Sequence, residues 1–204
     1  MVFPNVNIAF DLVNNRKALI MNNNKLTQTV FMGLFAALIA VCSQIQIPGA
    51  VPFTLQTFAV FLAVGLLGGK RGTVSVLIYI LLGAIGLPVF AGFKGGIGAL
   101  LGTTGGYIIG FIFSALVMLA FEKISVKGKV KKMILLGISM VAGLIVCYAF
   151  GTAWFMTVYT NTKEPIGIAT ALSWCVIPFI IPDIIKIALA LTLTSRLKRF
   201  IPFE

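Results

Sequence analysis

Histidine is absent from the 204-residue chain, and cysteine occurs only three times, at Cys42, Cys147 and Cys175. The three cysteines lie far apart within apolar stretches and form no CxxC pair. Zinc and haem sites of the ordinary kinds need histidine or closely spaced cysteines. The sequence therefore predicts no metal site and no cofactor, and we expect the cysteines to be small apolar packing residues.

Charged side chains are scarce, because they make up 10% of the residues whereas 59% are hydrophobic. Residues 29–69 and 133–161 contain no charged residue, and both stretches are far longer than a core helix of a soluble domain. A helix needs about 20 apolar residues to cross a bilayer core of about 30 Å. The chain is therefore long enough for about six membrane spans with short loops, and it leaves no room for a separate soluble domain.

The motifs of ATP hydrolysis and of acid–base catalysis are also missing. The nearest approach to the nucleotide-binding pattern G-x-x-x-x-G-K-[ST] is GGKRG at residues 68–72, which lacks both the spacing and the hydroxyl. No histidine is available to pair with a nucleophile. We therefore expect a protein that is not an enzyme and that would need energy from other subunits for active transport.

Long apolar runs separated by breaking residues predict an all-α integral membrane protein with six transmembrane helices. The predicted spans cover residues 27–45, 55–67, 73–87, 104–121, 133–157 and from about 178 onward. Proline and glycine end several of these runs, as in the segment QIQIPGAVPF that follows the first. A short outer helix is expected at 167–175, and a glycine-rich outer loop at 92–106 joins the third and fourth helices.

The basic residues are unevenly placed along this pattern. Thirteen of the 16 lysines and arginines fall before the first span, between the second and third, between the fourth and fifth, or at the C-terminus. Cytoplasmic loops of membrane proteins carry such an excess of basic residues, so both termini are predicted to be cytoplasmic. The same clustering accounts for the net charge of +11, and we expect membrane lipid but no nucleic acid as a partner.

The first 22 residues stand apart from the membrane pattern. They lack the order of basic, apolar and cleavage regions that is typical of a signal peptide. Met21 opens the segment MNNNKLTQTVFMGLF, which looks like a natural start. We expect residues 1–22 to be a cytoplasmic N-terminal extension, either upstream of that start or a short amphipathic surface segment. Residues 23–204 are expected to form one six-helix membrane domain that binds a substrate.

Two charged residues fall inside the last predicted span, in the segment PFIIPDIIK. Asp183 and Lys186 are one helical turn apart and share a face. A lone charge at the centre of a bilayer costs about 2.5–3.5 kcal/mol on insertion scales, and an intramembrane ionisable residue marks a functional site by default. The alternative is a neutralised pair that only holds this helix against a neighbour. Pro182 removes a backbone donor and can free a carbonyl nearby.

The outer glycine-rich segment offers further polar groups beside an apolar run. Irregular backbone at membrane depth is tolerated only when it is buried in protein or lines a cavity, so we expect this loop to fold inward instead of being solvated. Glycines spaced four apart in GTTGGYIIGF also suit close packing of helices. The predicted ligand-binding residues of this segment are Lys94, Thr103, Thr104, Gly105, Gly106 and Tyr107.

Gln56 and Thr57 open the second predicted span. They can serve as ordinary helix-start or interhelical hydrogen-bonding residues. Gln56 is also predicted to contact the ligand. The two tryptophans, Trp154 and Trp174, are expected near the outer interface as anchors. Trp174 lies on the short outer helix, where it is also placed to cover a pocket. Such a pocket, mostly apolar with a few directed polar groups, suits a compact organic ligand.

Small residues on the first span offer a docking surface for another subunit. Ala36 and Ala40 form a small-xxx-small pair with Ala37 beside them. The alternative is packing of this helix against the rest of its own chain. Both interpretations remain open from the sequence.

Four segments in this order and spacing resemble the BioY family, whose members are substrate-binding (S) components of energy-coupling factor (ECF) transporters. They are VPFTLQTFAVFLAVGLLGGKRG, LLGAIGLPVFAG, LLGTTGGYIIGF and PFIIPDIIKIALA, and the resemblance covers about residues 25–195. The chain has Thr103–Thr104 where the family often has Pro-Thr, and Pro182 where it often has Gly.

The resemblance implies a six-helix S-component in a bacterial plasma membrane with biotin as its ligand. It also implies a transmembrane coupling subunit and two cytoplasmic ATPases as partners, with Ala36 and Ala40 facing the coupling subunit. Asp183 would accept a hydrogen bond from a ureido N–H of biotin, Lys186 would donate to the ureido carbonyl or orient Asp183, and Lys94 would meet the tail carboxylate. The implied function is high-affinity capture and uptake of biotin.

The main alternative is a stand-alone facilitator or secondary carrier for a small vitamin-like ligand. Uptake by this chain in cells without ATPase partners would favour it. A purely structural membrane subunit is a further alternative, and it predicts no tightly bound small ligand.

Overall fold

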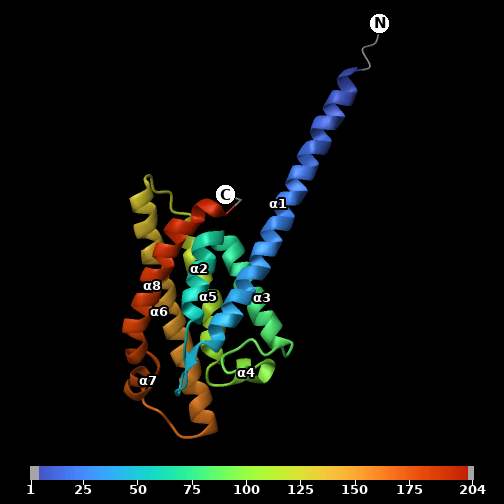
Figure 1. Ribbon diagram of the computed structural model, residues 1–204. Coiled ribbons are helices and arrows are strands. Elements are labelled where there is room, and N and C mark those ends of the chain that lie inside the picture. The colour runs from blue at the N-terminus through green and yellow to red at the C-terminus, as the bar shows by residue number, and fades with distance from the viewer. Residues whose placement is uncertain (1–4, 202–204) are drawn as a thin grey trace.

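The computed structural model describes the backbone of residues 5–201 and the side chains of residues 25–201. It is a bundle of helices whose ends carry short connecting elements (Figure 1). The prediction for residues 1–22 as a separate extension falls outside the residues with described side chains and stays a prediction. The prediction of a mostly helical protein is confirmed.

The helices follow one another with short connections. They are α1 (Asn5–Gln44), α2 (Gln56–Leu67), α3 (Gly69–Ala84), α4 (Ile97–Leu101), α5 (Gly105–Glu122), α6 (Lys129–Thr162), α7 (Ile168–Cys175), α8 (Ile177–Leu197) and the 3₁₀ turn η1 (Lys198–Phe200). A small antiparallel hairpin, which the sequence analysis treated only as a helix break, joins α1 to α2. Its strands are β1 (Gln46–Ile47) and β2 (Phe53–Thr54).

Four helical stretches are long and apolar enough to cross a membrane. They are Lys25–Gln44, Gly105–Glu122, Lys129–Thr162 and Ile168–Phe200. α2 is apolar but has 12 residues, which at 1.5 Å per residue give about 18 Å, less than the thickness of a bilayer core. Among the described residues, length and composition therefore support four spans, and the predicted number of six is not confirmed.

α2 lies at the centre of the bundle. It contacts α1, α3 and α8, and ten of its residues are buried, from Gln56 at its start to Leu67 at its end. A helix that is apolar on all sides is expected to be surrounded by other helices. Gly68, with φ of +81°, then reverses the chain so that α3 runs back beside α2. This turn requires glycine, because a positive φ is costly for other residues.

Glycines bring α5 and α6 into close contact along their length. The bare backbone of Gly106 faces the Trp154 side chain, and a Cβ at Gly110 would lie 2.9 Å from the Cys147 sulfur. On α6, Gly151 in turn leaves space for the Tyr107 ring of α5. Small residues allow helices to approach in this way within membranes. The packing role considered for the spaced glycines of GTTGGYIIGF is therefore present at Gly106 and Gly110.

The chain folds back against the bundle just before the outer glycine-rich segment. The Gly96 N–H donates to the Gly83 carbonyl at 2.7 Å, and the Ser43 hydroxyl donates to the Val89 carbonyl at 2.6 Å. Phe90 is 1% exposed and meets the Tyr79 ring edge-on with centroids 5.6 Å apart. Val89 and Phe90 precede the range 92–106 for which an inward fold was expected. Within that range the Gly96 N–H is bonded to α3, but Phe93 is 72% exposed and none of the five residues of α4 is buried.

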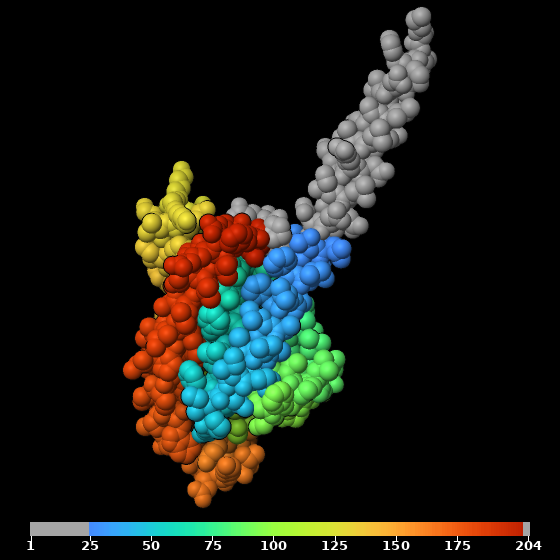
Figure 2. Space-filling model, in the orientation of Figure 1, coloured from blue at the N-terminus to red at the C-terminus, as the bar shows by residue number. Residues whose placement is uncertain are grey.

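The bundle has two chemically different ends. The lower end in Figure 1 carries the β-hairpin, α4 and α7, and we call it the site end. The upper end carries the α2–α3 turn, the α5–α6 connection and the end of α8, and we call it the lysine-rich end. Its basic residues are Lys70, Arg71, Lys123, Lys127, Lys129, Lys131, Lys132, Arg196, Lys198 and Arg199. Figure 2 shows the α5–α6 connection standing beside the last turns of α8 at this end.

Candidate functional site

A cavity of about 700 Å³ opens at the site end of the bundle. The β-hairpin, the start of α2, the glycine-rich segment, α5, α6, α7 and α8 all contribute to its wall. Pockets of about 300–1,000 Å³ with apolar walls and a few polar groups are typical of small-molecule sites. Segments far apart in the sequence therefore converge on a space large enough for a compact organic ligand.

Asp183 and Lys186 lie in the wall of this cavity on α8. The Lys186 Nζ is 2.7 Å from the Asp183 Oδ1, and the two residues are 3% and 1% exposed respectively. The i,i+3 spacing on one helix places both groups on the same face, as the sequence indicated. Burying two charges carries a desolvation cost that their attraction offsets only when further hydrogen bonds complete both groups.

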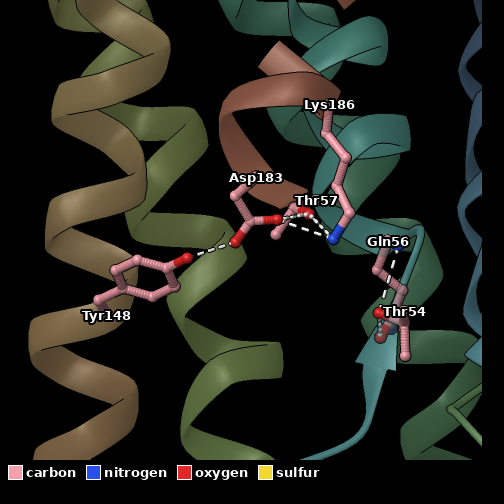
Figure 3. A network of polar contacts seen from close by, with 6 residues as sticks. All are labelled: Thr54, Gln56, Thr57, Tyr148, Asp183 and Lys186. Carbon is pink, nitrogen blue, oxygen red and sulfur yellow. Dashed lines mark hydrogen bonds and ion pairs between the residues drawn. The ribbon is translucent and has the colours of Figure 1, made fainter. Parts of the chain in front are cut away.

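Two other helices supply those further hydrogen bonds (Figure 3). The Thr57 hydroxyl on α2 donates to the Asp183 Oδ1 at 3.0 Å and accepts from the Lys186 Nζ at 3.1 Å. The Tyr148 hydroxyl on α6 donates to the Asp183 Oδ2. The ammonium also lies 4.1 Å from the centroid of the Phe53 ring, within the range of a cation–π interaction. The pair thus ties α2, α6, α8 and the β-hairpin together.

The hydrogen-bonding capacity of Asp183 is not exhausted by these contacts. An ionised carboxylate can accept about four hydrogen bonds. The described residues supply two donors to Oδ1 and one, Tyr148, to Oδ2. The protein therefore compensates the buried charge and still leaves acceptor capacity on Oδ2 beside an open cavity. A pair that served only to hold helices together would not need such a cavity.

Gln56 also lines the cavity, but its amide is engaged within the protein. Its Oε1 accepts from the Thr54 hydroxyl at 2.9 Å, and its Nε2 donates to the Tyr79 hydroxyl at 2.5 Å. Tyr79 is 0% exposed, so this hydrogen bond lies within the core. Gln56 therefore links the hairpin to α3, in agreement with the interhelical role considered for it, and it also shapes the cavity wall.

Some residues of the segment GTTGGY line the cavity, and others pack against neighbouring parts of the chain. Thr103, Thr104 and Tyr107 line the cavity, and the Tyr107 hydroxyl lies 2.8 Å from the Thr152 hydroxyl. Gly105 and Gly106, predicted as ligand-binding residues, do not line it. Gly105 packs against the backbone of Leu100 and Gly106 against Trp154, where a side chain would collide. The structure therefore assigns these two glycines to packing.

The remaining predicted residues occupy different positions around the site. Lys94 lines the cavity and is exposed, and its backbone pairs with that of Phe90. Trp174 does not line the cavity. It is 42% exposed and contacts the Tyr159 ring edge-on at 6.0 Å, so it does not cover the pocket in this conformation.

Ala36 has no surface to offer a partner in this structure. It is 1% exposed and belongs to the hydrophobic core, and Ala40 is partly buried and packs against that core. The predicted partner-binding role of Ala36 is therefore not supported, and the internal packing considered as its alternative is what the structure shows. Within residues 25–44 of α1, for which side chains are described, the exposed glycine and alanine residues are Gly33 and Ala37.

Sequence reasoning missed Tyr148 and undervalued Thr57. Tyr148 and Tyr159 are the two tyrosines in the uncharged run of residues 133–161, and a buried tyrosine usually needs a partner for its hydroxyl. That rule could have pointed to the intramembrane carboxylate. Phe53 gave no such signal, because only the hairpin brings its ring over Lys186 and within 6.0 Å of the Phe179 ring.

Comparisons with known proteins agree on one family. The family model described as the BioY family matches residues 15–203. The chain is 45% identical to the biotin transporter BioY of Thermotoga maritima over 175 residues, which is 84% of this chain and 96% of the relative. It is 41% identical to a probable biotin transporter BioY of Pyrococcus horikoshii, over 85% of this chain and 98% of the relative.

A solved structure also resembles the fold described above. It is the crystal structure of the S-component for biotin from an ECF-type ABC transporter, and it matches with a TM-score of 0.74. The sequence identity is 30%, and the match covers 87% of this chain and 94% of the other chain. Sequence and fold therefore lead to the same relatives.

Proposed function

The chain belongs to the BioY family, and from this premise we propose that it captures biotin and serves as the substrate-specific subunit of an ATP-driven ECF transporter. The family consists of transporter components and not enzymes. The observation that carries the proposal is the buried Asp183–Lys186 pair, which is compensated by protein groups and yet lines a cavity of about 700 Å³.

The polar end of biotin fits the acceptor capacity of Asp183. The ureido group of biotin has two N–H donors and one carbonyl acceptor. One N–H would donate to the Asp183 Oδ2, beside the hydrogen bond from Tyr148. The Lys186 ammonium already contacts Asp183, Thr57 and the Phe53 ring, so its role is to hold the carboxylate in its orientation.

The apolar and acidic parts of biotin fit the rest of the wall. Aromatic side chains of Tyr107, Phe111 and Phe179 line the cavity and would contact the thioether ring and the aliphatic tail. Among the described lining residues, Lys94 and Lys186 are the basic ones. Because Lys186 is engaged with Asp183, the exposed Lys94 at the rim is the group that would meet the tail carboxylate.

We further propose the membrane arrangement that this function requires. α2 and α3 would add two short spans to the four long ones, giving six helices with both termini in the cytoplasm of a bacterial cell. The lysine-rich end would face the cytoplasm, as the excess of basic residues favours. The cavity at the site end would then open to the outside, where a scarce vitamin is captured.

Energy for release would come from partner subunits. The chain has no nucleotide-binding loop, so a coupling subunit and two ATPases would supply the driving force. The exposed face of α1 is the surface we assign to the coupling subunit in place of the buried Ala36. Its residues are Val30, Gly33, Leu34, Ala37 and Val41, which recur at helical spacing.

Retention of radiolabelled biotin by the purified protein in detergent tests this proposal. We expect stoichiometric retention of biotin and none of thiamine or riboflavin, because only biotin combines a ureido edge with a tail carboxylate of this length. Equal retention of all three ligands, or of none, would contradict the ligand assignment. Biotin uptake by cells that express this chain without ATPase partners would instead favour the stand-alone carrier.

A further inference from the structure

A second cavity, of about 680 Å³, opens at the lysine-rich end of the bundle. The ends of α2, α5 and α8, the beginning of α6 and the connection at residues 123–128 form its wall. Nothing in the proposed capture of biotin uses this space, which lies at the opposite end of the helices from Asp183. Its chemistry is therefore considered separately.

The charge around this cavity is strongly positive. Four lysines from three parts of the chain line it, namely Lys123, Lys129, Lys132 and Lys198. Glu122 is the one carboxylate among the described lining residues, and its Oε2 accepts the Gly69 N–H at 2.6 Å. No ion pair within residues 25–201 neutralises the four lysines. The cavity therefore attracts anions.

A buried hydroxyl in the same wall has no partner. Thr194 is 1% exposed, and its Oγ1 finds no hydrogen-bonding group among the described residues. The hydroxyl faces the bare backbone of Gly65, which also lines the cavity. Buried polar groups are nearly always hydrogen-bonded, so the Thr194 hydroxyl leaves one unused donor in the wall of this cavity, as the Ser114 hydroxyl does elsewhere in the bundle.

The first turn of α6 faces the same space. α6 has 34 residues and begins beside Gly128, with no side-chain cap and no acidic residue in its first turn. Its unpaired N–H groups and positive dipole end favour an anion. The rest of the wall combines apolar side chains, among them Met118, Phe121, Leu135 and Leu136, with the serines Ser125, Ser139 and Ser195. A free inorganic anion would gain nothing from the apolar side chains, whereas the acyl region of a lipid would.

We propose that this cavity binds the phosphodiester headgroup of an anionic phospholipid. The phosphate oxygens would accept from the lysine ammonium groups, the α6 N-terminus and Thr194, while the upper acyl carbons pack on the apolar wall. Basic pockets between transmembrane helices on the cytoplasmic side bind acidic lipid headgroups in this way. The inference rests on the proposed membrane arrangement but is independent of the ligand at the site end.

Native mass spectrometry of the full chain, released from detergent with phosphatidylglycerol or phosphatidylcholine, tests the proposal. The variant Lys129→Gln/Lys132→Gln removes two lining charges. Its matched control is Lys127→Gln/Lys131→Gln, which removes two charges from the same segment outside the lining. We expect the first variant to lose about tenfold or more of its phosphatidylglycerol affinity, and the control to lose less than about threefold.

The outcomes separate a lipid site from general attraction of anions. Equal losses in both variants, or equal retention of the two lipids by the parent protein, would overturn the proposal. Binding of inorganic phosphate or glycerol phosphate as tight as that of phosphatidylglycerol would overturn the choice of a lipid. Thr194→Val keeps the side-chain shape, and we expect it to weaken phosphatidylglycerol binding severalfold. The thermal midpoint of each variant in detergent reports folding. Biotin retention by the parent, measured in parallel, tests the site-end proposal separately, so the failure of one proposal is distinguishable from the failure of the other.

Discussion

The two cavities are nearly equal in volume, about 700 and 680 Å³, but they treat charge in opposite ways. At the site end, one carboxylate and one ammonium are buried together and completed by Thr57 and Tyr148. At the lysine-rich end, four ammonium groups stay exposed to solvent and have no carboxylate partner among the described residues. A buried charge must be compensated by the protein itself, whereas an exposed charge is solvated by water and stays accessible to a ligand.

This difference predicts where substitutions will be severe. A change in the site-end pair disturbs both folding and ligand binding, because the same atoms stabilise the bundle and face the cavity. A change in the lysine-rich cavity should affect only what binds there, since its cations are solvated without a ligand. The predictions below test this separation, beginning with the largest expected effect.

Asp183→Ala should be the most damaging single substitution. It leaves the Lys186 ammonium buried without its counter-charge, and removing one partner of a buried pair typically costs about 3–5 kcal/mol of stability. It also removes the proposed acceptor for the ureido group. We expect a large drop in the thermal midpoint in detergent and loss of measurable biotin retention. A parent-like affinity for biotin in folded Asp183→Ala would show that the cavity is not the site.

The double variant Asp183→Asn/Lys186→Met separates stability from binding. It removes both charges together and keeps side chains of similar size, and such replacements are often nearly neutral for stability. We expect a thermal midpoint well above that of Asp183→Ala, with biotin binding still lost. Recovery of both properties would mean that the charges act on the ligand only through the stability of the bundle, and would weaken the proposed contact.

Tyr148→Phe should have an intermediate effect. It removes one hydrogen bond to an ionised group, and such bonds contribute about 1.5–3 kcal/mol. We expect a lower thermal midpoint and about tenfold weaker biotin binding, because Asp183 loses the donor that orients Oδ2. Tyr159→Phe on the same helix is the matched control, since Tyr159 makes ring contacts with Phe155 and Trp174. Equal effects of the two substitutions would argue against a specific role of Tyr148.

The comparison of the two ends also explains what the sequence could predict. Helices, breaks and the crowding of lysines at one end follow from local composition, because apolar runs and basic flanks are readable residue by residue. The pairing of Asp183 with Lys186 was equally local, since both lie on one turn of α8. The short outer helix expected at 167–175 is present as α7 (Ile168–Cys175) for the same reason.

What could not be predicted depends on contacts between distant segments. Tyr148 and Thr57 reach Asp183 only because α6, α2 and α8 pack together. A single sequence does not show which of its helices make such contacts. The same limit applies to Gly105 and Gly106. Glycine permits close approach by a ligand or by another helix, and only the position of Trp154 decides for packing at Gly106.

Lys94→Gln should produce the smallest effect at the site end. It tests whether an exposed charge in this cavity contributes to ligand binding without contributing to stability. Lys94 is exposed and has no side-chain contact with the Asp183 network, so the substitution should leave the thermal midpoint unchanged. Ion pairs of exposed groups are weak and screened by salt, so we expect roughly two- to fivefold weaker binding of biotin at low ionic strength, and a smaller difference at high salt.

Biotin methyl ester supplies the control, because it lacks the tail carboxylate while keeping the ureido group. Parent and variant should bind the ester equally. If Lys94→Gln weakened the ester as much as biotin, Lys94 would act on the shape of the glycine-rich segment and not on the carboxylate, and the exposed charge would have to be assigned a structural role.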